Sequence, residues 1–128
     1  MRALHADVGQ LLMVGFEGHE PPAELRQLIR EAGIGGVILF ARNVAEPTQV
    51  AELVRELQGI ARDAGHSRPL LVGVDQEGGR VARLKDAWAL WPPLRAVGRI
   101  GSEETARRLG AALAEQVASC GIHLDFAP

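Results

Sequence analysis

The chain has 128 residues, of which 47% are apolar, and its formal net charge is -2. This length is typical of one domain, and the balanced charge gives no reason to expect a nucleic acid or an anionic membrane as partner. No apolar run approaches the ~18 residues that a membrane span needs. The single cysteine, Cys120, excludes an intrachain disulfide. Together with an N-terminus that lacks a secretory signal, it predicts a cytoplasmic protein.

Strand and helix patterns alternate along the whole chain. Part of the first apolar run, residues 11–16, can instead form the end of a short helix opened by Asp7. In chain order, the sequence predicts a strand over residues 11–16, a helix from Pro21 to Gly33, a strand over 36–40, a helix from Pro47 to Gly65, a strand over 70–74, a long loop over 84–101, a helix from Ser102 to Gly121 and a strand over 123–128.

The first and last of these helices each have an apolar face at helical spacing. In the first helix this face consists of Leu25, Leu28, Ile29 and Ala32. In the last helix it consists of Ala106, Leu109, Leu113, Val117 and Cys120. We expect both faces to be buried against a sheet.

The alternation of strands and helices predicts an α/β fold with a parallel sheet and right-handed crossovers. Two architectures have this order, an open doubly wound sheet and a (β/α)8 barrel. A barrel takes about 250 residues, and this chain ends inside its fourth strand. We therefore expect residues 1–128 to form the first half of a (β/α)8 TIM barrel, truncated after four strands, with open strand edges and an open inner face.

The most informative segment runs from Leu70 to Arg83, where an apolar strand ends in two carboxylates, two glycines and two arginines. Asp75 and Glu77 are two residues apart, so they share a face if the strand continues, while Gln76 points the other way. We expect Gly78 and Gly79 to turn the chain sharply and to leave room for a ligand. Arg80 and Arg83 can then return charged donors to the same place.

This segment resembles glycoside hydrolase family 3, with DQEGGR (75–80) as the family's most distinctive early motif. The resemblance extends over nearly the whole chain. It includes VGQLLMVGF (8–16), GGVILFARN (35–43), WPP (91–93) and LDFAP (124–128). The chain is most similar to bacterial β-N-acetylhexosaminidases that act on cell-wall fragments in peptidoglycan recycling.

The resemblance implies that Asp75 and Arg83 bind the sugar, as acceptor and donor for its polar groups. It also implies retaining hydrolysis through a covalent glycosyl-enzyme. The family's nucleophile and the branch's acid/base lie further downstream, so no catalytic residue is expected in this chain. No cofactor is implied, and the partners are a small saccharide and the missing C-terminal half of the barrel.

Five further polar residues are candidates for lining the site. Glu77 either lines it or orients a neighbour, and Arg80 either contacts the ligand or forms a structural salt bridge. Asp125 ends a predicted strand, and Arg42 and Asn43 follow another. The histidines (His5, His19, His66 and His123) are scattered without ligand spacing, so no metal site is expected. Trp88 and Trp91 either stack on a sugar ring or anchor the long loop, and we expect the latter.

Two other functions remain open. A β-glucosidase or β-xylosidase of the same family would have a second α/β domain downstream with a carboxylate acid/base. A non-catalytic saccharide-binding module would end near residue 128 and need a partner or a dimer to cover its open edges.

Overall fold

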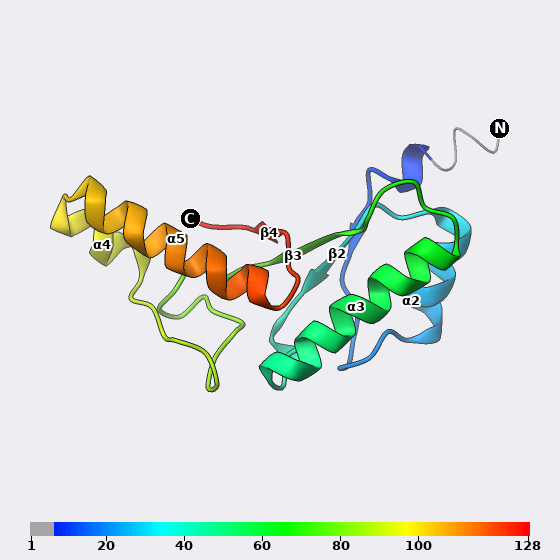
Figure 1. Ribbon diagram of the computed structural model, residues 1–128, viewed down its shortest axis with the longest axis horizontal. Helices are drawn as coiled ribbons and strands as arrows, with labels where there is room; N and C mark the ends of the chain where they lie inside the picture. Colours follow the sequence, from blue (N-terminus) through cyan, green and yellow to red (C-terminus); the bar gives the residue numbers. More distant parts are fainter. Residues whose placement is uncertain (1–6) are drawn as a thin grey trace.

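The computed structural model describes residues 7–128, which form a four-stranded parallel sheet with helices against it (Figure 1). The strands are β1 (Met13–Val14), β2 (Gly36–Leu39), β3 (Leu71–Val74) and β4 (Leu124–Asp125), and they pair in chain order. A doubly wound sheet reverses its strand order at a switch point, whereas a (β/α)8 barrel does not. The observed order confirms the predicted first half of a barrel.

The connections between the strands are mainly helical. The helices are α2 (Ala23–Gln27), which continues as a π-helical turn over Leu28–Ala32, α3 (Pro47–Asp63), α4 (Leu94–Ile100) and α5 (Glu103–Ser119), and a 3-10 turn spans Ala41–Asn43. Ser102 caps α5 as predicted, its hydroxyl accepting a hydrogen bond from the backbone N–H of Thr105. Within residues 7–128, no helix is long and apolar enough to cross a lipid bilayer.

Helices α2 and α3 and the C-terminal end of α5 pack against one face of the sheet and form a single core with it, whereas α4 packs against α5. Side chains of β2 and β3 that point to this face are fully buried, namely Val37, Leu39, Val72 and Val74. They join one cluster with residues of α2, α3 and α5, and the buried thiol Cys120 belongs to it. On the other face, Leu71 and Phe126 are 53% and 44% exposed. In the described part of the chain, the inner face of the half-barrel is therefore much less covered than the outer one.

Several details differ from the sequence prediction. The predicted loop over 84–101 contains α4. Residues 7–9 are helical and residues 10–11 form a turn, so a short helix precedes the first apolar run, but no residue of that run (11–16) is helical. The strand expected over 11–16 is limited to β1, Met13–Val14. The N-terminal residues 1–6, including His5, lie outside the described part.

Two residues expected on buried helix faces are exposed. Leu28 is 42% exposed, at the point where α2 changes to the wider π-helical turn. Ala106 is exposed because the first half of α5 lies beside α4 and extends beyond the sheet (Figure 1).

Candidate functional site

Polar residues gather at the carboxyl ends of β3 and β4. Asp75 directly follows β3, and Asp125 is the last residue of β4. The backbone N–H of Gln76 donates to Oδ1 of Asp125 at 2.8 Å, which ties the two strand ends together. In α/β barrels this end of the strands holds the functional site.

Asp75 and Arg83 form an ion pair at this end. Nη2 of Arg83 lies 3.0 Å from Oδ2 of Asp75, and their side chains are 26% and 23% exposed, respectively. Nε of Arg83 is buried and has no hydrogen-bond partner among the described residues. Because both side chains are partly exposed, the pair offers carboxylate acceptors and guanidinium donors beyond those it uses internally.

Gln76 holds the loop that brings Arg83 back to Asp75. Its side chain is only 1% exposed. Its Oε1 accepts hydrogen bonds from the backbone N–H groups of Arg83 (2.8 Å) and Leu84 (3.0 Å), and its Nε2 donates to the carbonyl of Leu84 (3.0 Å). Sequence reasoning missed this residue, although a polar side chain directed to the core side of a strand must find buried partners.

The two glycines turn the chain as predicted, but they do not leave room for a ligand. Gly78 and Gly79 have φ values of 80° and 60°, in the left-handed region. A Cβ on Gly78 would lie 2.4 Å from the carbonyl oxygen of Pro92, and one on Gly79 would lie 2.7 Å from Cγ of Pro93. The expectation of ligand space is wrong because the proline segment fills it.

The tryptophans anchor the loop after this turn. The backbone N–H of Gly79 donates to the carbonyl of Trp91 at 2.8 Å. The indole N–H of Trp91 donates to the side chain of Gln116 on α5. Trp88 is partly buried and packs against the core. These contacts agree with the anchoring role predicted for both residues.

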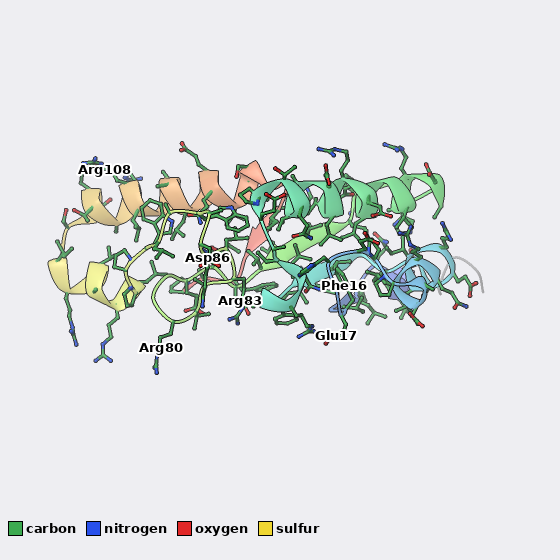
Figure 2. All side chains as sticks on the ribbon, turned by 90° about the horizontal axis from the view of Figure 1, so that it is seen from below. Phe16, Glu17, Arg80, Arg83, Asp86 and Arg108 are labelled. Carbon is green, nitrogen blue, oxygen red and sulfur yellow. The ribbon has the colours of Figure 1, made fainter. Side chains whose placement is uncertain are left out.

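Arg80 and Glu77 do not join the ion pair. Arg80 is exposed, and Figure 2 shows its side chain projecting away from the fold, whereas Arg83 is directed inward. Glu77 donates its backbone N–H to the carbonyl of Val81 at 2.8 Å. Within residues 7–128, neither side chain forms an ion pair. The expectation that Arg80 returns to the site is wrong for this structure, because it lies at the tip of the turn.

The carboxyl group of Asp125 is partly buried and lies near two other carboxylates. Its burial raises the pKa of its carboxyl above the ordinary value of 3.8, and the hydrogen bond from the Gln76 N–H opposes this shift. The nearby carboxylates of Asp75 and Glu77 raise the pKa further. Asp125 therefore lies within electrostatic reach of Asp75, and its role in lining the site stays a prediction.

Arg42 links the loops that follow β1 and β2. Its Nε donates to the carbonyl of Phe16 at 2.8 Å and lies 2.9 Å from the carboxylate of Glu17. Its guanidinium also lies 4.6 Å from the ring centroid of Phe40. The side chain is 43% exposed, so it remains accessible at the carboxyl end of the sheet.

Asn43 does not line the site, contrary to the expectation from sequence. Its side chain is fully buried. Its amide donates to the carbonyls of Phe16 (3.1 Å) and Gly18 (2.8 Å), and its oxygen accepts the backbone N–H of Phe40 (2.9 Å). The residue is structural because it satisfies three backbone groups of two neighbouring loops.

Two hollows of about 510 and 440 Å³ lie at the opposite, amino end of the sheet. Both are lined by His66 and Ser67, which precede β3. Neither includes a residue of the Asp75–Arg83 pair. In the described part of the chain, no group of three His, Cys, Asp or Glu side chains could hold a metal ion.

The sequentially ordered parallel sheet defines the chain as part of an α/β barrel. In such barrels the functional site lies at the carboxyl end of the strands, where this chain has the Asp75–Arg83 ion pair. The family model "Glycosyl hydrolase family 3 N terminal domain" matches residues 3–128. The chain belongs to this family.

Curated relatives are similar over most of the chain. A β-hexosaminidase of Thiobacillus denitrificans is 38% identical over 123 residues, covering 91% of this chain and 33% of the relative. A β-hexosaminidase of Pseudomonas aeruginosa is 41% identical over 118 residues, covering 91% of this chain and 34% of the relative. The chain thus spans about a third of the length of these relatives.

Solved structures show the same fold. The family 3 β-N-acetylglucosaminidase of Paenibacillus sp. str. FPU-7 aligns with a TM-score of 0.93 and 43% identity, over 98% of this chain and 24% of that one. NagZ from Neisseria gonorrhoeae, in complex with a zinc ion, aligns with a TM-score of 0.78 and 29% identity, over 91% of this chain and 36% of that one.

Proposed function

We propose that this chain is the first part of a retaining β-N-acetylhexosaminidase that hydrolyses terminal N-acetylglucosaminides. The observation that supports this function is the Asp75–Arg83 pair in the DQEGGR segment, at the carboxyl end of β3. Relatives named β-hexosaminidase and β-N-acetylglucosaminidase support the same reaction.

In this proposal Asp75 and Arg83 bind the terminal sugar and do not break its bond. The Asp75 carboxylate accepts hydrogen bonds from sugar hydroxyls, and Arg83 orients that carboxylate while donating to a sugar oxygen. Retaining hydrolysis also needs a nucleophile and an acid/base, and we assign both to the remainder of a longer protein. The length of the relatives and the exposed Leu71 and Phe126 on the inner face support such a remainder.

The proposed substrates are N-acetylglucosaminides of peptidoglycan fragments, hydrolysed in the cytoplasm. A NagZ structure from Neisseria gonorrhoeae in complex with N-trifluoroacetyl-D-glucosamine supports recognition of an N-acylated glucosamine. Isolated cell-wall fragments and cell fractionation test these two parts of the proposal separately.

The first measurement is the intact mass of the native gene product. A mass well above the 13.7 kDa of this chain supports a longer enzyme. A mass of 13.7 kDa would instead favour a non-catalytic saccharide-binding module.

The second measurement is hydrolysis by the complete protein of aryl N-acetyl-β-glucosaminide, β-glucoside and β-xyloside. We expect turnover of the first, and Asp75→Ala should lower kcat/KM at least about a hundredfold because sugar hydroxyls lose a charged acceptor. Asp63→Ala is the matched control, since Asp63 is 78% exposed at the end of α3. Unchanged kcat/KM in Asp75→Ala would refute the site, and preference for the glucoside or xyloside would favour the other branch of the family.

A further inference from the structure

We propose that Gln76 is a positioning residue for the sugar-binding pair: its carboxamide fixes the returning loop so that the guanidinium of Arg83 meets the carboxylate of Asp75. This inference rests on the proposed function, because that function assigns the pair to the substrate. It adds a residue that touches neither the sugar nor the reacting bond.

The side-chain hydrogen bonds of Gln76 are made to the backbone of Arg83 and Leu84. The chain leaves β3 at Asp75, turns at Gly78 and Gly79, and returns towards the strand end. On its return, the backbone N–H of Arg83 donates to Oε1 of Gln76 at 2.8 Å. The carboxamide is thus attached to the main chain of the same residue whose side chain meets Asp75.

Three of the four hydrogen bonds that the carboxamide can make are formed with this loop. Its oxygen accepts two N–H groups, and its nitrogen donates to the carbonyl of Leu84 at 3.0 Å. Because Gln76 is only 1% exposed, water cannot replace these bonds if the side chain loses them. An apolar replacement would therefore release the loop.

Asp125 fixes the other end of the arrangement. Its Oδ1 accepts the backbone N–H of Gln76 at 2.8 Å, so β4 holds the main chain from which the carboxamide projects. Asp75 and Gln76 are neighbours in the sequence, and Arg83 is held by Gln76. The two partners of the ion pair are consequently positioned from a single residue.

A double-mutant cycle tests the inference in the complete protein. Its variants are Gln76→Met, Arg83→Ala and the double variant, and kcat and KM are measured on aryl N-acetyl-β-glucosaminide. Gln58→Met is the matched control, because the Gln58 carboxamide makes two analogous bonds to the backbone N–H (3.0 Å) and carbonyl (2.9 Å) of Leu70, near the amino end of β3.

We expect Gln76→Met to lower kcat/KM about tenfold to a hundredfold when Arg83 is present, because displaced binding groups misplace the substrate. In the Arg83→Ala background, Gln76→Met should have little further effect on kcat/KM, since the guanidinium that Gln76 positions is absent. Gln58→Met should lower the melting temperature and leave kcat/KM unchanged. An equal loss from Gln76→Met in both backgrounds would overturn the inference and make Gln76 a purely structural residue.

Asp125 provides a second route if Gln76→Met does not fold. Asp125→Asn keeps an oxygen acceptor for the Gln76 N–H, whereas Asp125→Ala removes it. We expect Asp125→Ala to raise KM and Asp125→Asn to restore most of the loss. Equal activity of Asp125→Ala and the parent protein would overturn this part of the inference.

Failure of the proposed function is distinguishable from failure of the positioning role. If the complete protein hydrolyses none of the three aryl glycosides, the proposed function fails, and amide hydrogen exchange over residues 77–84 decides the positioning role. Faster exchange in Gln76→Met, or in Asp125→Ala where Gln76→Met does not fold, and not in Gln58→Met supports it. Unchanged exchange in the variant tested overturns it.

Discussion

Replacing Gly78 by alanine tests whether the Asp75 loop is clamped against the proline segment. Gly78 has a φ of 80°, and a Cβ there would lie 2.4 Å from the carbonyl oxygen of Pro92 and 3.1 Å from that of Trp91. Both neighbours are backbone atoms, so they cannot move aside as a flexible side chain would. The main chain of one of the two segments must shift.

The expected loss of folding stability in Gly78→Ala is the sum of three contributions. A left-handed conformation costs an alanine about 1–2 kcal/mol, and inserting a methyl group into a filled space costs about 1–3 kcal/mol. Separation of the segments also stretches the 2.8 Å hydrogen bond from the Gly79 N–H to Trp91, which is worth about 1 kcal/mol. We therefore expect Gly78→Ala to destabilise the protein by about 3–6 kcal/mol.

Gly65→Ala is the matched control, because Gly65 has a φ of 83° and nothing within 4 Å of its Cβ position. It should cost only the conformational part, about 1–2 kcal/mol. Denaturant unfolding of the complete protein and both variants gives the comparison. If Gly78→Ala is no more destabilising than Gly65→Ala, the clamp does not exist and the loop is held by other contacts.

Two further predictions concern buried polar groups. Asn43→Ala should destabilise the protein by about 2–4 kcal/mol, because the fully buried carboxamide gives up its hydrogen bonds to the Phe40 N–H and to the carbonyls of Phe16 and Gly18; a loss below 1 kcal/mol in urea unfolding would contradict this. Asp125→Asn should gain stability relative to the parent protein as pH rises. The pKa of Asp125 is raised in the folded state, so its stabilising contribution is present below its ordinary pKa and is lost as pH passes the folded pKa. A melting-temperature difference that does not change between pH 3 and pH 8 would refute this assignment.

The order of the main strands and helices could be predicted because each has a local signal. Pro47 and Gly65 bracket α3, and Ser102 caps α5. The helix α4 was not predicted because its apolar periodicity is short, although Pro93 precedes it and Gly101 ends it in the left-handed conformation. Such a short helix is stabilised by packing against α5 more than by its own sequence.

The site was predictable only in part, and the difference between two arginines shows why. Arg80 and Arg83 have the same charge and both lie shortly after Asp75, so local pattern alone cannot choose between them, and only the family resemblance singles out Arg83. The choice depends on where Gln76 attaches the returning loop, since its carboxamide bonds the backbone at Arg83 while Arg80 remains at the tip of the turn. The alternation of a strand predicts that Gln76 faces the core. It does not predict which distant backbone groups the carboxamide meets, and that tertiary contact determines which cation reaches the carboxylate.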